Sequence, residues 1–168
     1  MNIAFILEKA LGLYGDKEAV VCGEERFTYG QFAERTYRLA NFLKKAGIVK
    51  GDCVAVLHHN SHEFLECYFA AAQVGAILNP LNFRLSPGEL AFILKDAGAS
   101  LLVAARRFGG QVASLADMAT DLKGVVWTGA GENPDVPGSL DYEDILQGQS
   151  LVPPDAPQIS DDDVAHLY

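Results

Sequence analysis

The amino-acid sequence predicts an α/β protein with a mostly parallel sheet, helices on both faces and an N-terminal β-hairpin. The main observation is a repeated pattern in which a helical stretch ends at glycine and a short apolar strand follows. It recurs in LKKAGIVKGDCVAVL, AAAQVGAILNPL and ILKDAGASLLVA, and more weakly in DLKGVVWTG. Strands that alternate with helices form parallel sheets covered on both faces. The 168 residues, 49% of them apolar, suffice for one domain with a sizeable core.

The first part of the chain predicts a helix followed by a hairpin. EAVVCGEERFTYG contains two strand-like stretches that turn at residues 23–25. We therefore divide the chain into three parts. Residues 1–29 hold the helix and the hairpin, and residues 30–128 hold the repeated helix–strand units. Residues 129–168 form connections rich in proline, glycine and acids, and then a final buried strand.

Two helices are expected from their apolar patterns. Residues 30–46 are amphipathic, and the residues that share the apolar face are Phe32, Leu39, Ala40, Leu43 and Ala46. Residues 61–74 are apolar almost all round, so this helix should be deeply buried.

Local signals mark where helices begin and end. SPGEL has Ser86 as the cap, proline in the first turn and Glu89 three residues after the cap, which is a well-formed helix start. Gly47, Gly75 and Gly98 are expected to end helices in the left-handed conformation that glycine adopts readily.

The composition argues against several classes of protein. A net charge of −9 does not suit a nucleic-acid partner, which requires clustered lysine and arginine. No apolar run approaches the length of a transmembrane segment. The three cysteines are odd in number and include no C-x-x-C, which favours reduced thiols in a cytoplasmic protein.

Polar residues follow two of the predicted strands. Parallel sheets bind ligands at the carboxyl ends of their strands, so such residues are candidates for ligand contact. The candidates are His58, His59 and Asn60 after CVAVL, and Asn79, Asn82 and Arg84 after GAIL. The alternative is that each only satisfies loop backbone, which is the commoner role of polar loop residues.

No residue can be assigned to catalysis, to cofactor binding or to a metal. His58, His59 and His62 suggest a metal site, but neighbouring strand side chains point to opposite faces and no further ligand stands at a zinc spacing. GAGENPDVPG lacks the glycine order of a phosphate loop, and its prolines remove N–H donors. No Ser/His/Asp triad is recognisable.

Residues 26–94 carry a combination of features more specific than any one of them. The features are Thr28-Tyr29 before the amphipathic helix, Gly51-Asp52 before a strand, Asn60 followed by Glu63-Phe64, and Gly75-Ala76 leading into Pro80-Leu81-Asn82 and Arg84-Leu85. This stretch closely resembles the N-terminal part of the adenylate-forming acyl-CoA synthetases, the AMP-binding ligases related to luciferase. A weaker similarity continues to the end of the chain.

The resemblance implies a ligase that uses ATP and Mg²⁺ to form an acyl-adenylate, and coenzyme A to form a thioester of a fatty or aryl acid. PLNFRLSPGEL is more similar to acyl-CoA and aryl-CoA ligases than to peptide-synthetase modules. In the family, a stretch resembling DDVAHLY runs into a phosphate loop, whereas this chain stops at Tyr168. We therefore expect an incomplete N-terminal domain that has no ligase activity and no cofactor of its own.

Two other functions remain open. The first is a naturally short, non-catalytic binding or assembly module on the same scaffold, which would cover its final strand with polar residues; the apolar VAHLY counts against it. The second is a flavodoxin-like ligand-binding protein, but no phosphate-binding turn follows any predicted strand.

An incomplete domain exposes apolar surface that its missing part would cover. We therefore predict that this chain on its own dimerises, aggregates or binds hydrophobic dyes. Gel filtration with light scattering measures the self-association. A strictly monomeric, highly soluble chain that binds no dye would contradict the prediction.

Overall fold

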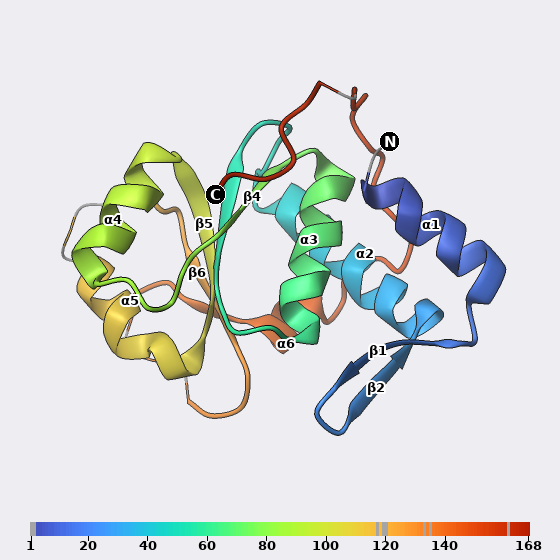
Figure 1. Ribbon diagram of the computed structural model, residues 1–168, viewed down its shortest axis with the longest axis horizontal. Coiled ribbons are helices and arrows are strands. Elements are labelled where there is room, and N and C mark those ends of the chain that lie inside the picture. The colour runs from blue at the N-terminus through green and yellow to red at the C-terminus, as the bar shows by residue number, and fades with distance from the viewer. Residues whose placement is uncertain (1–2, 117, 119–120, 133, 135, 161) are drawn as a thin grey trace.

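The computed structural model describes residues 3–168 except 117, 119–120, 133, 135 and 161, and Figure 1 shows its arrangement. The helices are α1 (Ile3–Tyr14), α2 (Tyr29–Lys45), α3 (His62–Val74), α4 (Pro87–Asp96), the 3₁₀ turn η1 (Arg106–Phe108), α5 (Gly109–Ala116) and α6 (Tyr142–Leu146). The strands are β1 (Glu18–Cys22), β2 (Glu25–Thr28), β3 (Cys53–Leu57), β4 (Ile77–Pro80), β5 (Ala99–Ala105), β6 (Val125–Thr128) and β7 (Leu140–Asp141).

Five strands form one parallel sheet, in the order β4-β3-β5-β6-β7. All residues of β3 and β6 are buried, as expected of strands that are covered on both faces. The parallel sheet predicted from the alternation of strands and helices is confirmed.

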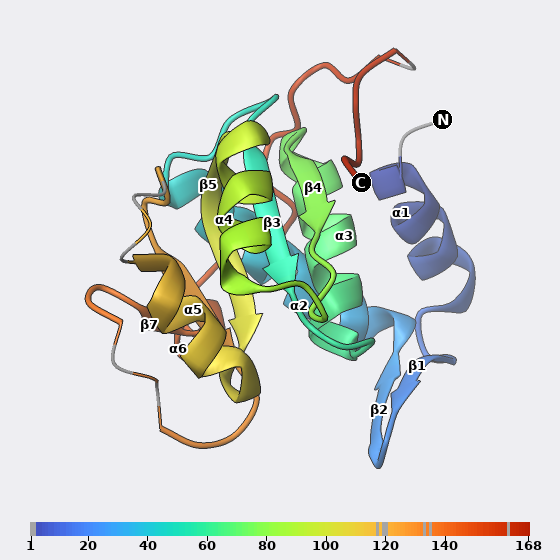
Figure 2. The ribbon, with the colours of Figure 1, turned by 60° about the vertical axis from the view of Figure 1, so that its left-hand side comes forward.

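The two faces of the sheet pack against different helices. Val54 and Val56 point into a core cluster with residues of α2, α3 and α6, whereas Ala55 and Leu57 point into a second cluster with residues of α4 and α5. Figures 1 and 2 show these helices on opposite sides of the sheet. This division follows from the alternating direction of side chains along a strand, and the prediction of helices on both faces is confirmed.

The N-terminal hairpin and helix form a separate layer against α2 and α3. β1 and β2 pair in antiparallel orientation and turn at Gly23, which has φ 62°. A third apolar cluster joins Leu7 of α1 to Phe32 and Tyr37 of α2. The hairpin extends away from the main sheet (Figure 1).

The local helix signals agree with the structure. Ser86 and Glu89 form the capping box of α4, and Ser61 caps α3. Gly47, Gly75 and Gly98 have φ of 81°, 73° and 58°, so each adopts the left-handed conformation predicted for it.

Two details of the helix predictions are wrong. Ala46 is exposed, because α2 ends before it and Ala46 is the C-cap. Leu65 is 41% exposed, so α3 is not buried all round; the first half of this helix borders the surface. Helical periodicity locates a face but does not say how far the neighbouring elements cover it.

The last forty residues differ from the prediction of connections followed by a buried strand. They contain β7 and the short helix α6, whose Tyr142 and Leu146 are buried. The terminal segment makes a single parallel bridge, from His166 to Leu78 of β4. It is not buried, since Val164 is 57% exposed and Tyr168 is 89% exposed.

Gly75 is required both by its backbone and by its surroundings. An added Cβ would lie 3.1 Å from Cγ of Lys50 and of Pro157. We predict that Gly75→Ala lowers the free energy of unfolding by about 1–2 kcal/mol, because alanine is strained at positive φ. Urea unfolding measures the change.

Gly88 provides the opposite control. It lies in the first turn of α4, and no atom stands within 4 Å of an added Cβ. Gly88→Ala should raise the free energy of unfolding by about 0.5 kcal/mol, because alanine is the better helix former. Equal effects of the two substitutions would show that neither backbone conformation nor contact decides the result.

Candidate functional site

The carboxyl edge of the sheet has a defined switch point. From β3 the chain continues to β4 on one side, and then crosses to β5 on the other side of β3. Sheets of this kind bind ligands where the order reverses, outside the carboxyl ends of the two strands. Here that position is between β3 and β5, next to His58 and His59.

The side chain of His58 reaches past the end of β5 and contacts β6. Its Nδ1 lies 2.6 Å from the carbonyl oxygen of His59, and its Nε2 lies 2.7 Å from Oγ1 of Thr128. A carbonyl only accepts, so Nδ1 carries the proton, and neutral Nε2 accepts from the Thr128 hydroxyl. Burial lowers the pKa of His58, although the bond to His59 and the charge of Glu63 oppose the shift.

The ring of His59 lies among aromatic side chains from two other loops. Its centroid is 4.2 Å from that of Phe83 and 5.1 Å from that of Phe108. Phe83 follows β4 and Phe108 follows β5, so the three rings connect the loops on either side of the switch point. The protein's own side chains occupy this position.

The other four candidates are dispersed along the same edge. Asn60 is exposed. Asn82 accepts a hydrogen bond at Oδ1 from the backbone N–H of Arg84 (3.1 Å), and the exposed Arg84 guanidinium lies 5.4 Å from the centroid of Phe83.

Asn79 is the buried member of the six, with 2% of its surface exposed. Its Nδ2 donates to the carbonyl oxygen of Leu167 at 2.8 Å. Its Oδ1 has no hydrogen-bond partner among the residues that the structure describes. A buried amide oxygen normally accepts a hydrogen bond, so Asn79 retains an unused capacity for contact.

A second polar group lies beneath this edge, between α2, α3 and α6. The carboxylate of Glu66, which is fully buried, accepts from Arg35 Nε at 2.7 Å and from Tyr142 Oη at 2.6 Å, and it lies 2.9 Å from His62 Nδ1. Arg35 also donates to both oxygens of Glu143. Burial and the Glu66 charge raise the pKa of Tyr142, so its hydroxyl remains a donor.

His62 connects this group to the hairpin. Its Nε2 lies 2.9 Å from the carboxylate of Glu25, and its ring centroid lies 4.8 Å from that of Phe27. Burial acts to lower the pKa of His62, but the hydrogen bond to Glu66 and the charges of Glu63 and Glu66 outweigh it. Its pKa is therefore raised.

The site residues that the sequence analysis missed came from distant parts of the chain. Thr128, Phe83 and Phe108 meet His58 and His59 only through the sheet order. Glu66 had a usable signal, because an acid four residues after His62 in a largely apolar helix faces the same side.

The described part of the chain offers neither a metal-binding cluster nor a membrane-spanning helix. It contains no group of three or more His, Cys, Asp or Glu side chains placed to hold a metal ion. None of its helices is long and apolar enough to cross a membrane.

A parallel sheet covered on both faces defines an α/β domain, and polar side chains along its carboxyl edge are the arrangement in which such domains bind ligands. The sequence matches the family model of AMP-binding enzymes over residues 7–168, and the chain therefore belongs to this family.

Curated relatives are CoA ligases or CoA synthases. The medium/long-chain-fatty-acid–CoA/3-oxocholest-4-en-26-oate–CoA ligase of Mycolicibacterium smegmatis is 30% identical over 100% of this chain and 31% of its own length. Indoleacetate–CoA ligase of Aromatoleum aromaticum is 32% identical over 95% of this chain and 30% of its own length. Feruloyl-CoA synthase of Amycolatopsis sp is 41% identical over 73% and 26%, respectively. The chain thus spans less than a third of the length of these relatives.

Solved structures agree with the fold. The anthranilate CoA ligase AuaEII in complex with anthranoyl-AMP has a TM-score of 0.91 over 99% of this chain and 31% of its own, at 27% identity. The N-terminal domain of FACL13 from Mycobacterium tuberculosis has a TM-score of 0.81 over 99% and 41%, at 27% identity. The predicted acyl-CoA synthetase fold is confirmed.

His58 and His62 should titrate on opposite sides of the ordinary value of 6.5. We predict a midpoint below it for His58 and above it for His62, measured by NMR of the imidazole rings. Protonation of His58 opposes folding, so its contribution to stability is lost as the pH falls below about 6.5. The contribution of His62 is present below that pH and lost as the pH rises through its own raised pKa.

The variants His58→Asn and His62→Gln assign the two signals. Glu63→Gln is the matched test of cause, since the charge of Glu63 raises the pKa of both histidines. Both midpoints should fall in this variant. A reversed order of the two midpoints would contradict the tautomer and the hydrogen bonds described above.

Proposed function

We propose that this chain contributes the N-terminal part of an ATP-dependent ligase that joins a carboxylic acid to coenzyme A through an acyl-adenylate. The observation that carries the proposal is the family match over residues 7–168, together with relatives named as CoA ligases at 30% and 32% identity. The chain covers about 30% of the length of these relatives, which supports the proposal that it is part of a longer protein. In this proposal the chain alone supplies part of the scaffold and does not catalyse the reaction.

The proposed substrate is a fatty or aryl carboxylic acid, with ATP, Mg²⁺ and coenzyme A as the other reactants. The relatives' names include a fatty acid, indoleacetate and ferulate, which share a carboxylate and differ in the rest of the molecule. A fatty acid would place the ligase in fatty acid metabolism.

Asn79 and Arg84 are the strongest of the six proposed contact residues. Asn79 retains a buried amide oxygen without a partner in the described part of the chain, and Arg84 presents an exposed guanidinium that suits an anionic group. His58 and His59 instead contact Thr128 and the two phenylalanines. We propose that they shape the loops at the edge.

A cytoplasmic location is part of the proposal. Burial raises the pKa of Cys53 to about 11 and raises the pKa of Cys67 as well, so both thiols remain protonated. Buried, unreactive thiols suit a reducing compartment.

The first experiment measures the mass and the activity of the product of the native gene. We expect a protein several times heavier than 18.1 kDa that releases pyrophosphate only when a carboxylic acid is present and then forms a CoA thioester. Medium-chain and long-chain fatty acids, indoleacetate and ferulate form the first substrate panel. The 168-residue chain assayed alone is the control and should release none.

Two results would contradict the proposal. One is a native product of 18.1 kDa without acid-dependent pyrophosphate release, which would favour a binding or assembly module. The other is a longer product that consumes ATP without any dependence on a carboxylic acid.

A further inference from the structure

Residues 150–160, which we call the strap, cross the outside of α2 and lead to the edge of β4 (Figures 1 and 2). Side chains of α2 and of the loop after it donate hydrogen bonds to main-chain carbonyls of the strap. The bonds run from Asn41 Nδ2 to Ser150 (3.2 Å) and Val152 (2.9 Å), from Lys44 Nζ to Asp155 (3.4 Å), and from Lys50 Nζ to Gln158 (2.9 Å).

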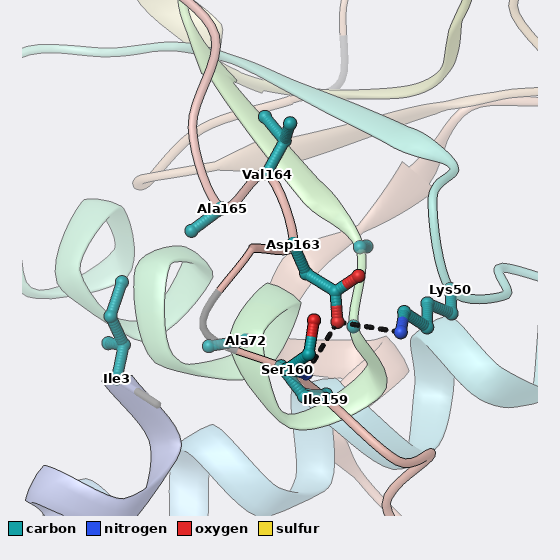
Figure 3. Close-up of a pocket in the computed structure, with 10 residues that line it drawn as sticks. Ile3, Lys50, Ala72, Ile159, Ser160, Asp163, Val164 and Ala165 are labelled. Atoms are coloured by element: carbon teal, nitrogen blue, oxygen red, sulfur yellow. Dashed lines mark hydrogen bonds and ion pairs between the residues drawn. The ribbon is translucent and has the colours of Figure 1, made fainter. Parts of the chain in front are cut away.

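Apolar packing holds the strap mainly at Pro154, which is buried, and at Pro157, which is partly buried next to Gly75. Leu151 is 46% exposed and Val152 is 68% exposed. Two cavities, of about 270 and 230 Å³, are lined partly by strap residues, and Lys50 lines both. Figure 3 shows the first of them, between Ile3, Ala72 and the residues after the strap. The polar contacts therefore act together with these two prolines in holding the strap.

Lys50 contacts both the strap and the residues that follow it. Its Nζ lies 2.6 Å from Oδ2 of Asp163, and the same carboxylate oxygen accepts from the backbone N–H of Ser160 at 2.7 Å (Figure 3). One ammonium group therefore joins Gln158 of the strap to Asp163 just after it. An ammonium has three donors, which allows both contacts at once.

The chain pairs with β4 immediately after Asp163. The N–H of Leu78 donates to the carbonyl of Ala165 at 3.0 Å, and the N–H of Leu167 donates to the carbonyl of Leu78 at 3.0 Å. A slip of one residue would exchange the two faces of such a strand. Val164, Ala165 and Leu167 are exposed, so their burial does not select the register; the one partly buried side chain, His166, has its ring centroid 4.6 Å from that of Tyr68.

We propose that Lys50 is a positioning residue whose contacts with Gln158 and Asp163 set the register in which residues 164–168 pair with β4. The consequence for a ligand rests on the proposed function. In that ligase, the register places the carboxyl end of a sixth parallel strand beside Asn79, at the edge where such sheets bind ligands.

Hydrogen exchange of single amides in the 168-residue chain tests the proposal. In Lys50→Met, the amides of Leu78 and Leu167 should exchange roughly tenfold faster, because a hydrogen-bonded charge contributes about that much. The amides of β5 should not change. Lys50→Arg should restore protection, since arginine keeps the charge and the donors. Lys45→Met is the matched control, because Lys45 is an exposed neighbour with no ion pair among the described residues.

Asp163→Asn gives a second test should Lys50→Met fail to fold. This variant keeps the bond from Lys50 to Gln158 and loses only the ion pair, so the same two amides should exchange a few times faster. Unchanged protection in both variants would overturn the proposal. Equal acceleration of the β5 amides would also overturn it, since Lys50 would then stabilise the whole fold. The measurement needs no substrate, so a negative pyrophosphate assay leaves it unaffected.

Discussion

The carboxylate of Glu66 is fully buried between α2, α3 and α6. Each helix supplies one of its hydrogen-bond partners, which are Arg35, His62 and Tyr142. A buried carboxylate that lacks partners costs several kcal/mol, so the three helices must dock together for this face of the sheet to form. The requirement is strictest for α6. Its five residues are too few to form a stable helix in isolation. The bonds from Tyr142 to Glu66 and from Arg35 to Glu143, together with the burial of Ile145 and Leu146, therefore account for its position.

The residues around Glu66 interact electrostatically with the candidate ligand edge. α3 begins immediately after the loop that carries His58 and His59, and Glu63 in its first turn acts on the pKa of both His58 and His62. His62 also contacts the hairpin through Glu25. The charge of Glu63 near the edge therefore also acts on the pKa of His62, which contacts the hairpin and Glu66.

Much of the fold could be predicted because its signals are local. The cap at Ser86 and the left-handed glycines depend on neighbouring residues only, so they agree with the structure. Contacts between distant residues were not predictable in this way. Glu66 meets Arg35 and Tyr142 across 31 and 76 residues, and α6 exists because of that meeting.

In the candidate site, too, local features were predictable and contacts between distant residues were not. The sequence places polar residues directly after two strands, and they lie at the carboxyl edge of the sheet, but it could not say which loops would meet there. His59 lies against Phe83 and Phe108 because β4 and β5 flank β3, and neither phenylalanine has a distinctive local signal. The terminal segment was predicted to be buried because its residues are apolar. Only the three-dimensional arrangement shows that it lies on an open edge.

Apart from the packing of Pro154 and Pro157, the strap is attached through its carbonyl oxygens, a group that every amino acid possesses. Proline lacks the N–H but keeps the carbonyl, so the three prolines at positions 153, 154 and 157 are compatible with this attachment. Evolution can therefore replace most side chains of the strap without detaching it. The constraint falls on the donors, and substitutions at Asn41 and Lys50 should be tolerated far less often than substitutions in the segment they hold.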